Sequence, residues 1–297
     1  MTILKSVEDA SVNYVQEALE GFIEARYVRK CPEYFICYLS SQTACNRGCR
    51  FCWLTATKQT SNVHDVTPEE FLDQAWEVLG HYERSTPEEK AATQYMQYNY
   101  MARGEPLCNQ HLLRDADWLL MELGKRVTNR APHLGVRHNI STIMPQSFAP
   151  HELQNVFKIV HPTIYYSMYS ANDEFRRRWL PGAMPVRLAL EKLARWQKFS
   201  KKLIKIHHCL IAGENDSPAD FKDIALLLNE YDLRVEFNLV RYNPHSPEQG
   251  SESDDEQIAK YMGLMERFLP GKTKMIPRVG FDVKASCGMF VNKKGNV

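Results

Sequence analysis

Short apolar runs alternate with longer amphipathic segments along most of the chain, and each pattern predicts its own kind of element. Apolar and aromatic runs bounded by polar loops predict strands. These strands are expected at residues 34–40, 93–101, 136–144, 163–170, 203–213 and 233–241. Apolar positions three and four residues apart predict helices. These helices are expected at residues 67–82, 111–127, 152–160, 186–199, 218–231 and 255–269.

Local signals indicate where some helices begin. Thr67 and Glu70 form a capping-box pair with Pro68 at the first helical position, so a helix should start there. The opening residues of the chain also follow a helical pattern, with Ser6 as the N-cap. We therefore expect residues 1–33 to form an N-terminal helical extension, ahead of a core that spans residues 34–297.

The alternation of strands and helices predicts parallel βα units and hence an α/β fold, a partial (β/α)6 TIM-like barrel. In such barrels, functional residues gather at the carboxyl ends of the strands. The polar motifs of this chain all follow predicted strands, namely the cysteine loop, "RGEP", "STIM", "SMYS" and "RYNP". A doubly wound sheet would fit the alternation as well, but no glycine-rich phosphate loop follows the first strand.

Composition and charge narrow the class of protein. With 297 residues, 44% hydrophobic and 25% charged, the chain is ordinary for a globular protein with a large core. No stretch approaches the roughly 20 apolar residues of a membrane span, and the N-terminus lacks a signal-peptide core, so we expect a cytoplasmic protein without membrane partners. The net charge is only +1, but residues 176–205 hold ten Lys and Arg against one acid. That stretch is either a phosphate contact or a solvated helix face.

The chain has eight cysteines, which a cytoplasmic environment would keep reduced. They are therefore metal ligands, catalytic thiols or small core residues. Cys45, Cys49 and Cys52 form a C-x3-C-x2-C loop with no fourth cysteine beside it. Zinc usually takes four ligands, whereas an iron–sulfur cluster on three thiolates leaves one iron open for a cofactor. A zinc site completed by a distant His or Cys, or packed core cysteines, are the alternatives.

The cysteine loop, with Phe51 just before Cys52, resembles the cluster loop of the radical S-adenosylmethionine (SAM) superfamily. The segment "SSQTACNRGCRFC" resembles "SSQxGCxxxCxFC" of the RlmN/Cfr family, radical methyltransferases of adenosine in 23S ribosomal RNA. Further matches follow in family order: "MARGEPLCN" with "MGMGEPLxN", "ISTIMP" with "xSTSGxxP", "YYSMYSANDEFRRRWLP" with "LAxSLHAxNDExRxxxxP", "FNLVRYNP" with "xNLIPxNP", and "SCGMF" with "ACGQL". Near the N-terminus, "IEARYV" resembles "VETVYI".

This resemblance implies two cofactors. Cys45, Cys49 and Cys52 would hold a 4Fe-4S cluster whose open iron binds SAM. An electron donor such as flavodoxin or ferredoxin would then allow SAM to form a 5′-deoxyadenosyl radical. Glu105 would pair with the ammonium group of SAM. The full set of implied cofactor-binding residues is Gly104, Glu105, Ser141, Ser167, Met168, Tyr169 and Asn243.

The resemblance also assigns a reaction to Cys287, in the C-terminal segment of a radical SAM core. That thiol would accept a methyl group from one SAM, and a radical from a second SAM would abstract a hydrogen from the methyl. The carbon radical would add to an adenine ring carbon of rRNA or tRNA, with C2 favoured. Cys37, or Cys31 as a fallback, would resolve the protein–RNA crosslink. Glu24, thirteen residues before Cys37, would accept the proton.

The chain departs from the family pattern in ways that leave the substrate open. One extra residue separates Cys37 from the "SSQ" motif, Tyr169 replaces His, Ile143–Met144 replace Ser–Gly, and Arg241 replaces Pro. The family's N-terminal domain, implicated in RNA contact, has no counterpart before the cluster loop, so residues 176–205 or a partner would have to bind RNA. Two further hypotheses are a radical SAM enzyme with a non-RNA substrate and a non-catalytic iron–sulfur or zinc protein that binds RNA.

Overall fold

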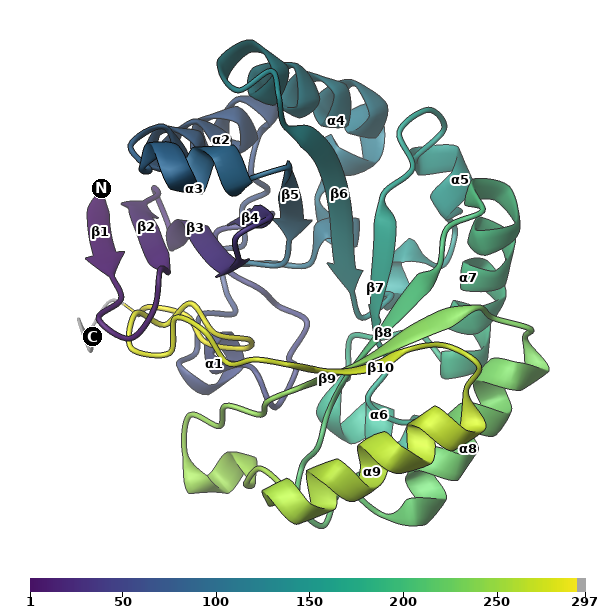
Figure 1. Ribbon diagram of the computed structural model, residues 1–297. Coiled ribbons are helices and arrows are strands. Elements are labelled where there is room, and N and C mark those ends of the chain that lie inside the picture. Colours follow the sequence, from purple (N-terminus) through teal and green to yellow (C-terminus); the bar gives the residue numbers. More distant parts are fainter. Residues whose placement is uncertain (293–297) are drawn as a thin grey trace.

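The computed structural model describes residues 1–292, which form one curved sheet of ten strands with helices on its outer face (Figure 1). The strands lie in chain order, from β1 at one edge to β10 at the other. The pairs from β1 to β4 are antiparallel, and those from β4 to β10 are parallel. This arrangement confirms the predicted α/β class and the partial TIM-like barrel.

The elements have the following bounds. The strands are Thr2–Lys5 (β1), Val12–Glu17 (β2), Phe22–Cys31 (β3), Tyr34–Tyr38 (β4), Tyr95–Tyr100 (β5), Gly135–Thr142 (β6), Thr163–Ser167 (β7), Ile204–Cys209 (β8), Val235–Val240 (β9) and Thr273–Ile276 (β10). The helices are Trp53–Ala56 (α1), Pro68–Glu83 (α2), Pro87–Ala92 (α3), Gln110–Arg130 (α4), Leu153–Val156 (α5), Asp173–Trp179 (α6), Val186–Ser200 (α7), Pro218–Glu230 (α8) and Asp255–Phe268 (α9). Among the helices of residues 1–292, none is long and apolar enough to cross a bilayer.

The N-terminal helix expected within residues 1–33 is wrong, because this region forms β1, β2 and β3. Ser6 lies in the turn between β1 and β2, where its hydroxyl donates to Asp282. Most of β3 is buried on both faces, since α2 packs on one side and the C-terminal segment covers the other. Burial between two layers removes the polar alternation that would have marked a strand in the sequence.

The six predicted strands correspond to β4 through β9, and five of the six predicted helices are present at nearly the expected length. The helix expected at residues 152–160 is shorter, ending at Val156. Asp117 on α4 explains the early end, because its carboxylate accepts hydrogen bonds from the backbone N–H groups of residues 158–160 at 2.9–3.1 Å. These bonds satisfy donors that would otherwise need a continuing helix.

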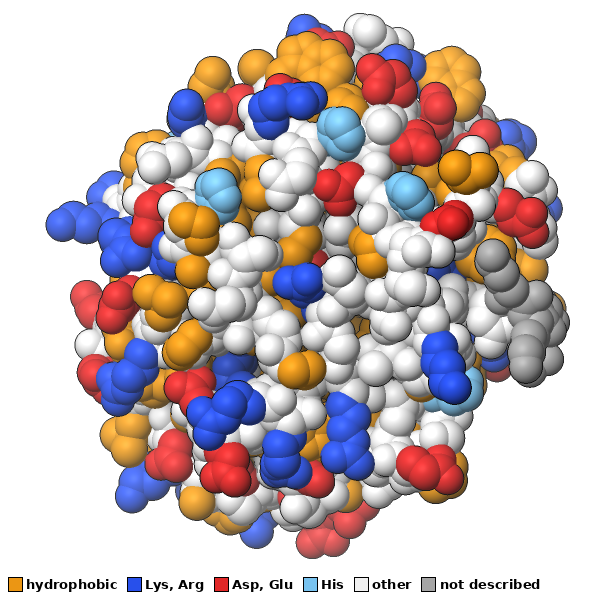
Figure 2. All heavy atoms as spheres, turned by 180° about the vertical axis from the view of Figure 1, so that it is seen from behind, with side chains coloured by type: hydrophobic (Ala, Val, Ile, Leu, Met, Phe, Trp, Pro, Cys, Tyr) orange, Lys and Arg blue, Asp and Glu red, His pale blue; other side chains and the backbone are white. Residues whose placement is uncertain are grey.

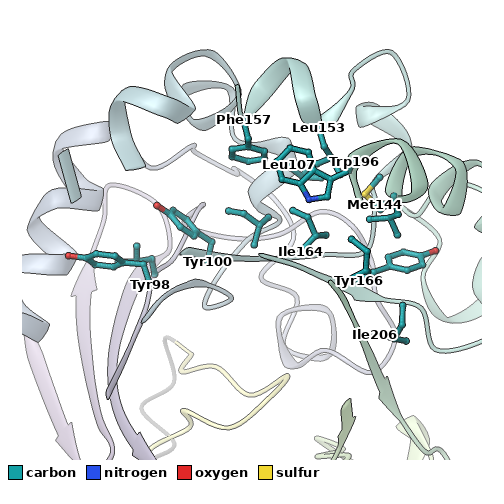
Figure 3. Close-up of a cluster of buried hydrophobic side chains, with 14 of the residues drawn as sticks. Tyr98, Tyr100, Leu107, Met144, Leu153, Phe157, Ile164, Tyr166, Trp196 and Ile206 are labelled. Carbon is teal, nitrogen blue, oxygen red and sulfur yellow. The ribbon is translucent and has the colours of Figure 1, made fainter. Parts of the chain in front are cut away.

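Alternate residues of the parallel strands face two different environments. The outward-facing side chains pack beneath the helices in a buried apolar layer that Figure 3 shows; it includes Tyr98, Tyr100, Ile164, Tyr166 and Ile206. The inward-facing side chains are more polar, and the strand register places Asn99 beside Asn139 and Ser167 beside His207. The curved sheet therefore surrounds a polar interior that opens at the carboxyl ends of its strands.

Candidate active site

Two adjoining cavities open at the carboxyl ends of the parallel strands and share Met101, Ser141 and Ser167 in their walls. The first, of about 620 Å³, is lined by the three clustered cysteines and is called the cluster cavity here. The second, of about 720 Å³, is lined by Cys287 and is called the Cys287 cavity.

The cluster loop follows β4 and brings its three cysteines to one wall as free thiols. The loop is anchored by backbone bonds from Ser41 N to Arg103 O at 2.7 Å and from Cys45 N to Gln59 O at 3.2 Å. Burial raises the pKa of Cys45 to about 12 and that of Cys52 to about 11, and it also raises the pKa of Cys49. Thiolates at such positions need a metal or another positive charge beside them.

The three thiols fit a cluster better than a single metal ion. Within residues 1–292, no three His, Cys, Asp or Glu side chains are grouped closely enough to hold one ion. A cluster of several irons binds each thiolate at a different corner and needs no such convergence. The donor set, three thiols on one cavity wall beside open space, thus suits an iron–sulfur cluster with an open coordination position.

Gly104 and Glu105 lie in the wall of the cluster cavity, and each is there for a steric or electrostatic reason. Gly104 has φ +90°, and a Cβ there would lie 2.6 Å from Gln42 Cβ, so only glycine fits. The Glu105 carboxylate accepts hydrogen bonds from Ile143 N at 3.1 Å and Leu107 N at 3.2 Å. Burial raises the pKa of Glu105 to about 7. Among the described residues no Lys or Arg forms an ion pair with it, so a cationic ligand would complete its environment.

The structure brings Ser141, Ser167, Tyr169 and Asn243 to the cavity walls but not Met168. The Met168 side chain is fully buried in the helix-facing core, because it points to the opposite face from its neighbours. Only the backbone of Met168 is therefore left to contact a ligand in these cavities. Asn243 donates from Nδ2 to the carbonyl of Cys287 at 2.9 Å, and its buried Oδ1 has no partner within residues 1–292. A ligand in the cavity could supply the missing donor.

Cys287 lies beside the cluster loop, although it is far from that loop in the sequence. After β10 the chain crosses toward α1 and the N-terminal strands, as Figure 1 shows. There Trp53 N, next to Cys52, donates to Gly288 O at 2.9 Å. A negative charge on Cys287 also raises the pKa of Cys52, as expected for neighbouring thiols. The Cys287 side chain is exposed to its cavity, where burial raises its pKa and the charges of Lys30 and Arg26 lower it.

Neither predicted resolving thiol, Cys37 or Cys31, lines the Cys287 cavity. Cys37 is fully buried in the helix-facing core, and its neighbour Tyr38 lines the Cys287 cavity instead. The extra residue before "SSQ" explains this difference, because a shift of one residue in a strand moves a side chain to the other face. Cys31 pairs with Tyr34 at the hairpin between β3 and β4, away from the carboxyl end of β4. We therefore assign neither cysteine to the reaction.

Glu24 lies near the Cys287 segment but lines neither cavity. Its fully buried carboxylate bonds to Arg103 Nε at 2.7 Å and Arg26 Nη2 at 2.8 Å. Burial opposes ionisation, but the two guanidinium groups outweigh it and hold the pKa of Glu24 below its usual value. A carboxylate with lowered pKa between two cations is a poor proton acceptor, so this geometry does not support the expected role.

Five of the ten cations at residues 176–205 form ion pairs with acids from other elements. Its ion pairs are Arg178–Glu214, Arg187–Glu230, Lys192–Glu152, Arg195–Glu152 and Lys205–Glu236. Figure 2 shows Lys and Arg side chains interspersed with Asp and Glu on the face seen from behind. Of the two expectations for this stretch, a phosphate contact or a solvated face, the five paired cations favour the solvated face.

Four cations line the Cys287 cavity although no sequence motif marked them as site residues: Arg26, Lys30, Arg241 and Arg278. Arg241 was visible only as a replacement of the family's Pro, and the other three carried no signal of their own. Arg241 and Arg278 share the carboxylate of Glu252 at 2.8 and 3.1 Å, whereas Lys30 forms no ion pair among the described residues. His207 also lines this cavity, and burial together with nearby lysines lowers its pKa to about 3.

Known proteins similar to this chain are RNA methyltransferases by name. No protein-family model matches the chain. A dual-specificity RNA methyltransferase RlmN from Lawsonia intracellularis is 24% identical over 85% of this chain and 66% of its own length. Another, from Wolinella succinogenes, is 27% identical over 96% of this chain and 78% of its own. A probable one from Thermosynechococcus vestitus is 26% identical over 95% and 77%. The chain thus spans about two thirds to four fifths of these relatives.

The fold has a close counterpart among solved structures. A radical SAM methyltransferase from Sphaerobacter thermophilus superposes with a TM-score of 0.78 at 18% identity. The superposition covers 97% of this chain and 80% of that one. The radical SAM type of partial barrel expected from the sequence is therefore confirmed at the level of the fold.

Proposed function

We propose that this chain, an RlmN/Cfr-type relative with the radical SAM fold, is a radical SAM methyltransferase that methylates an adenine ring carbon of RNA, C2 being favoured. The observation that carries the proposal is the position of Cys287 beside the cluster loop, in a cavity that adjoins the cluster cavity. In this proposal residues 34–292 belong to the radical SAM core, and its segment after β10 carries the methyl-accepting thiol.

Cys45, Cys49 and Cys52 would hold a 4Fe-4S cluster, and with SAM bound there these cofactors supply methyl groups and a 5′-deoxyadenosyl radical. Glu105 would hold the ammonium group of SAM in a charge-assisted hydrogen bond, which its buried and otherwise unpaired carboxylate favours. Ser141 and Ser167, shared by both cavities, and the unpartnered Oδ1 of Asn243 are further contacts for a polar ligand. An electron donor such as flavodoxin or ferredoxin would complete the system.

Cys287 would be the methyl acceptor. Burial raises the pKa of Cys287 and so disfavours its thiolate, which is the nucleophilic form, while the charges of Lys30 and Arg26 oppose this effect. The Cys287 sulfur would receive the methyl group that SAM supplies as the sulfonium–methyl bond breaks, and the thiol proton would go to solvent. Bonds from Trp53 N and Asn243 Nδ2 hold the carbonyls of Gly288 and Cys287, so the backbone around the sulfur is fixed before the reaction.

The lining of the Cys287 cavity supports RNA as the substrate. Lys30, which forms no ion pair among the described residues, provides positive charge for a phosphate, and Tyr38 and Tyr169 provide aromatic rings for a base. Ribosomal and transfer RNA are both consistent with an exposed adenine that could enter this cavity.

Mass spectrometry tests the proposal in two steps. Protein purified with its cluster intact should carry a methyl group on Cys287, and total RNA from cells that express it should contain a new methyladenosine. The Cys287→Ala variant should lose both signals. An unmodified Cys287 in cluster-loaded protein supplied with SAM would refute the proposed chemistry. Methylated Cys287 without methyladenosine in RNA would refute RNA as the substrate.

A further inference from the structure

A buried network of charged side chains connects three parts of the chain that are distant in sequence. Glu24 on β3 accepts hydrogen bonds from Arg26, Arg103 and Asn13, and all four of these residues are almost completely buried. Arg103 immediately precedes Gly104 and Glu105 in the wall of the cluster cavity. The network therefore reaches from the N-terminal strands to the predicted cofactor-binding motif.

The same network also holds the segment that carries Cys287. Arg26 donates from Nη1 to Ala285 O at 3.1 Å and from Nη2 to Met289 O at 2.8 Å, so its guanidinium group bridges the two sides of the Cys287 turn. Val291 N donates to Glu24 Oε1 at 3.2 Å, and Arg103 Nη2 donates to Val291 O. Every bond in this set uses the backbone of the segment, so it fixes the path of the chain independently of its side chains.

We propose that Glu24 is a positioning residue, which together with Arg26 and Arg103 fixes the segment 285–291 so that Cys287 faces the cavity next to the cluster loop. This inference rests on the proposed function for the role of Cys287. Glu24 aligns the two guanidinium groups, and these groups bind the carbonyls on both sides of the Cys287 turn. In the family strings quoted above, Val and Met stand at the positions of Arg26 and Arg103.

The structure distinguishes this role from that of a proton acceptor. A proton acceptor has to reach the reacting carbon, but Glu24 lines neither cavity, and four donors from Asn13, Arg26, Arg103 and Val291 already surround its carboxylate. Arg26 is different, because its side chain both belongs to the network and lines the Cys287 cavity. The network thus acts on the chemistry through the backbone of the segment.

Hydrogen exchange on the intact protein tests the proposal, with the Glu24→Gln variant as the main perturbation. Gln keeps the shape of the side chain but removes the charge that aligns the two arginines. We expect amide protection at residues 285–291 to fall about tenfold to a hundredfold, the usual effect of losing a hydrogen bond to a charged group. Methylation of Cys287, measured by mass spectrometry of the same protein, should fall in parallel.

A matched control and a second variant keep the result decisive. Glu152→Gln removes another carboxylate with two cationic partners, Lys192 and Arg195, and should leave exchange at 285–291 unchanged. Arg26→Lys keeps the positive charge, but one ammonium group cannot bridge the carbonyls of Ala285 and Met289, so it should increase exchange as Glu24→Gln does. If Glu24→Gln does not fold, the milder Arg26→Lys variant decides whether the network fixes the segment 285–291.

Two outcomes would overturn the proposal. One is unchanged exchange at 285–291 in folded Glu24→Gln or Arg26→Lys protein. The other is normal methylation of Cys287 in Glu24→Gln with accumulation of a protein–RNA crosslink, which is the signature of a missing proton acceptor. Exchange does not depend on SAM chemistry. An unmethylated Cys287 in the wild-type protein would therefore refute the proposed function. It would not affect the exchange test of whether Glu24 fixes the segment 285–291.

Discussion

Replacing Glu105 with Gln should weaken SAM binding and remove its pH dependence. The Glu105 carboxylate is only 5% exposed, and burial raises its pKa from 4.5 to about 7. The ammonium group of SAM would bind the ionised form, so affinity should decrease as pH falls through 7. With that pKa, about 90% of the carboxylate is ionised at pH 8 and about 10% at pH 6, which predicts about tenfold weaker binding at pH 6.

The Glu105→Gln variant should bind SAM about tenfold to a hundredfold more weakly than the wild type at pH 8, because a hydrogen bond to a charged group contributes roughly 1.5–3 kcal/mol. Its affinity should not change between pH 6 and pH 8. The free energy of unfolding changes with pH in the opposite direction to the affinity for SAM. A raised native pKa means that the folded protein without SAM loses stability as pH rises from 4.5 to about 7, by about 3 kcal/mol over those 2.5 pH units. Gln should restore part of this stability at pH 8.

Equilibrium binding of SAM to anaerobically reconstituted protein measures the first effect, and denaturant unfolding of the protein without SAM measures the second. The matched control is Glu152→Gln, whose carboxylate lies outside both cavities and should leave the pH profile of SAM binding intact. Equal SAM affinity at pH 6 and pH 8 in the wild type, or a Glu105→Gln variant with wild-type affinity at pH 8, would refute the reasoning.

Three further predictions concern single residues. Gly104→Ala should abolish detectable SAM binding and lower the melting temperature, because its Cβ would lie 2.6 Å from Gln42 Cβ; retained binding in a titration would contradict this. Cys37→Ala should cause no accumulation of a protein–RNA crosslink by mass spectrometry and cost about 1–2 kcal/mol of stability, as for a small buried side chain; an accumulated crosslink would return Cys37 to the site. Lys30→Gln should reduce the slope of log affinity for RNA against log salt by about 1, and an unchanged slope would exclude a phosphate contact.

The βα core could be predicted from the sequence because each of its elements satisfies a local rule. The Thr67–Glu70 capping box marks the start of α2 in the structure as it does in the sequence. The cysteine loop was recognisable because its ligands come from one short segment. The N-terminal strands could not be predicted in this way. Both faces of β3 are buried, by α2 and by the C-terminal segment, and neither partner is near it in sequence.

The predicted site residues show the same difference between what local sequence and what long-range packing determines. Gly104, Glu105, Ser141 and Asn243 lie at the ends of parallel strands, where the fold brings all such ends together, so their motifs were sufficient. Cys37 shows the opposite case, because a motif match that is out of register by one residue places the thiol on the wrong face of β4.

The sequence by itself determined the class of fold and the three-thiol loop, because these depend on periodicity and spacing within short segments. Only the tertiary structure decided that Cys287 meets the cluster loop, that Glu24 is enclosed by two arginines, and that half of the 176–205 cations are paired. The physical reason is that hydrogen bonds and ion pairs depend on distance in space. Long-range pairing in a curved sheet sets those distances, and no local pattern records them.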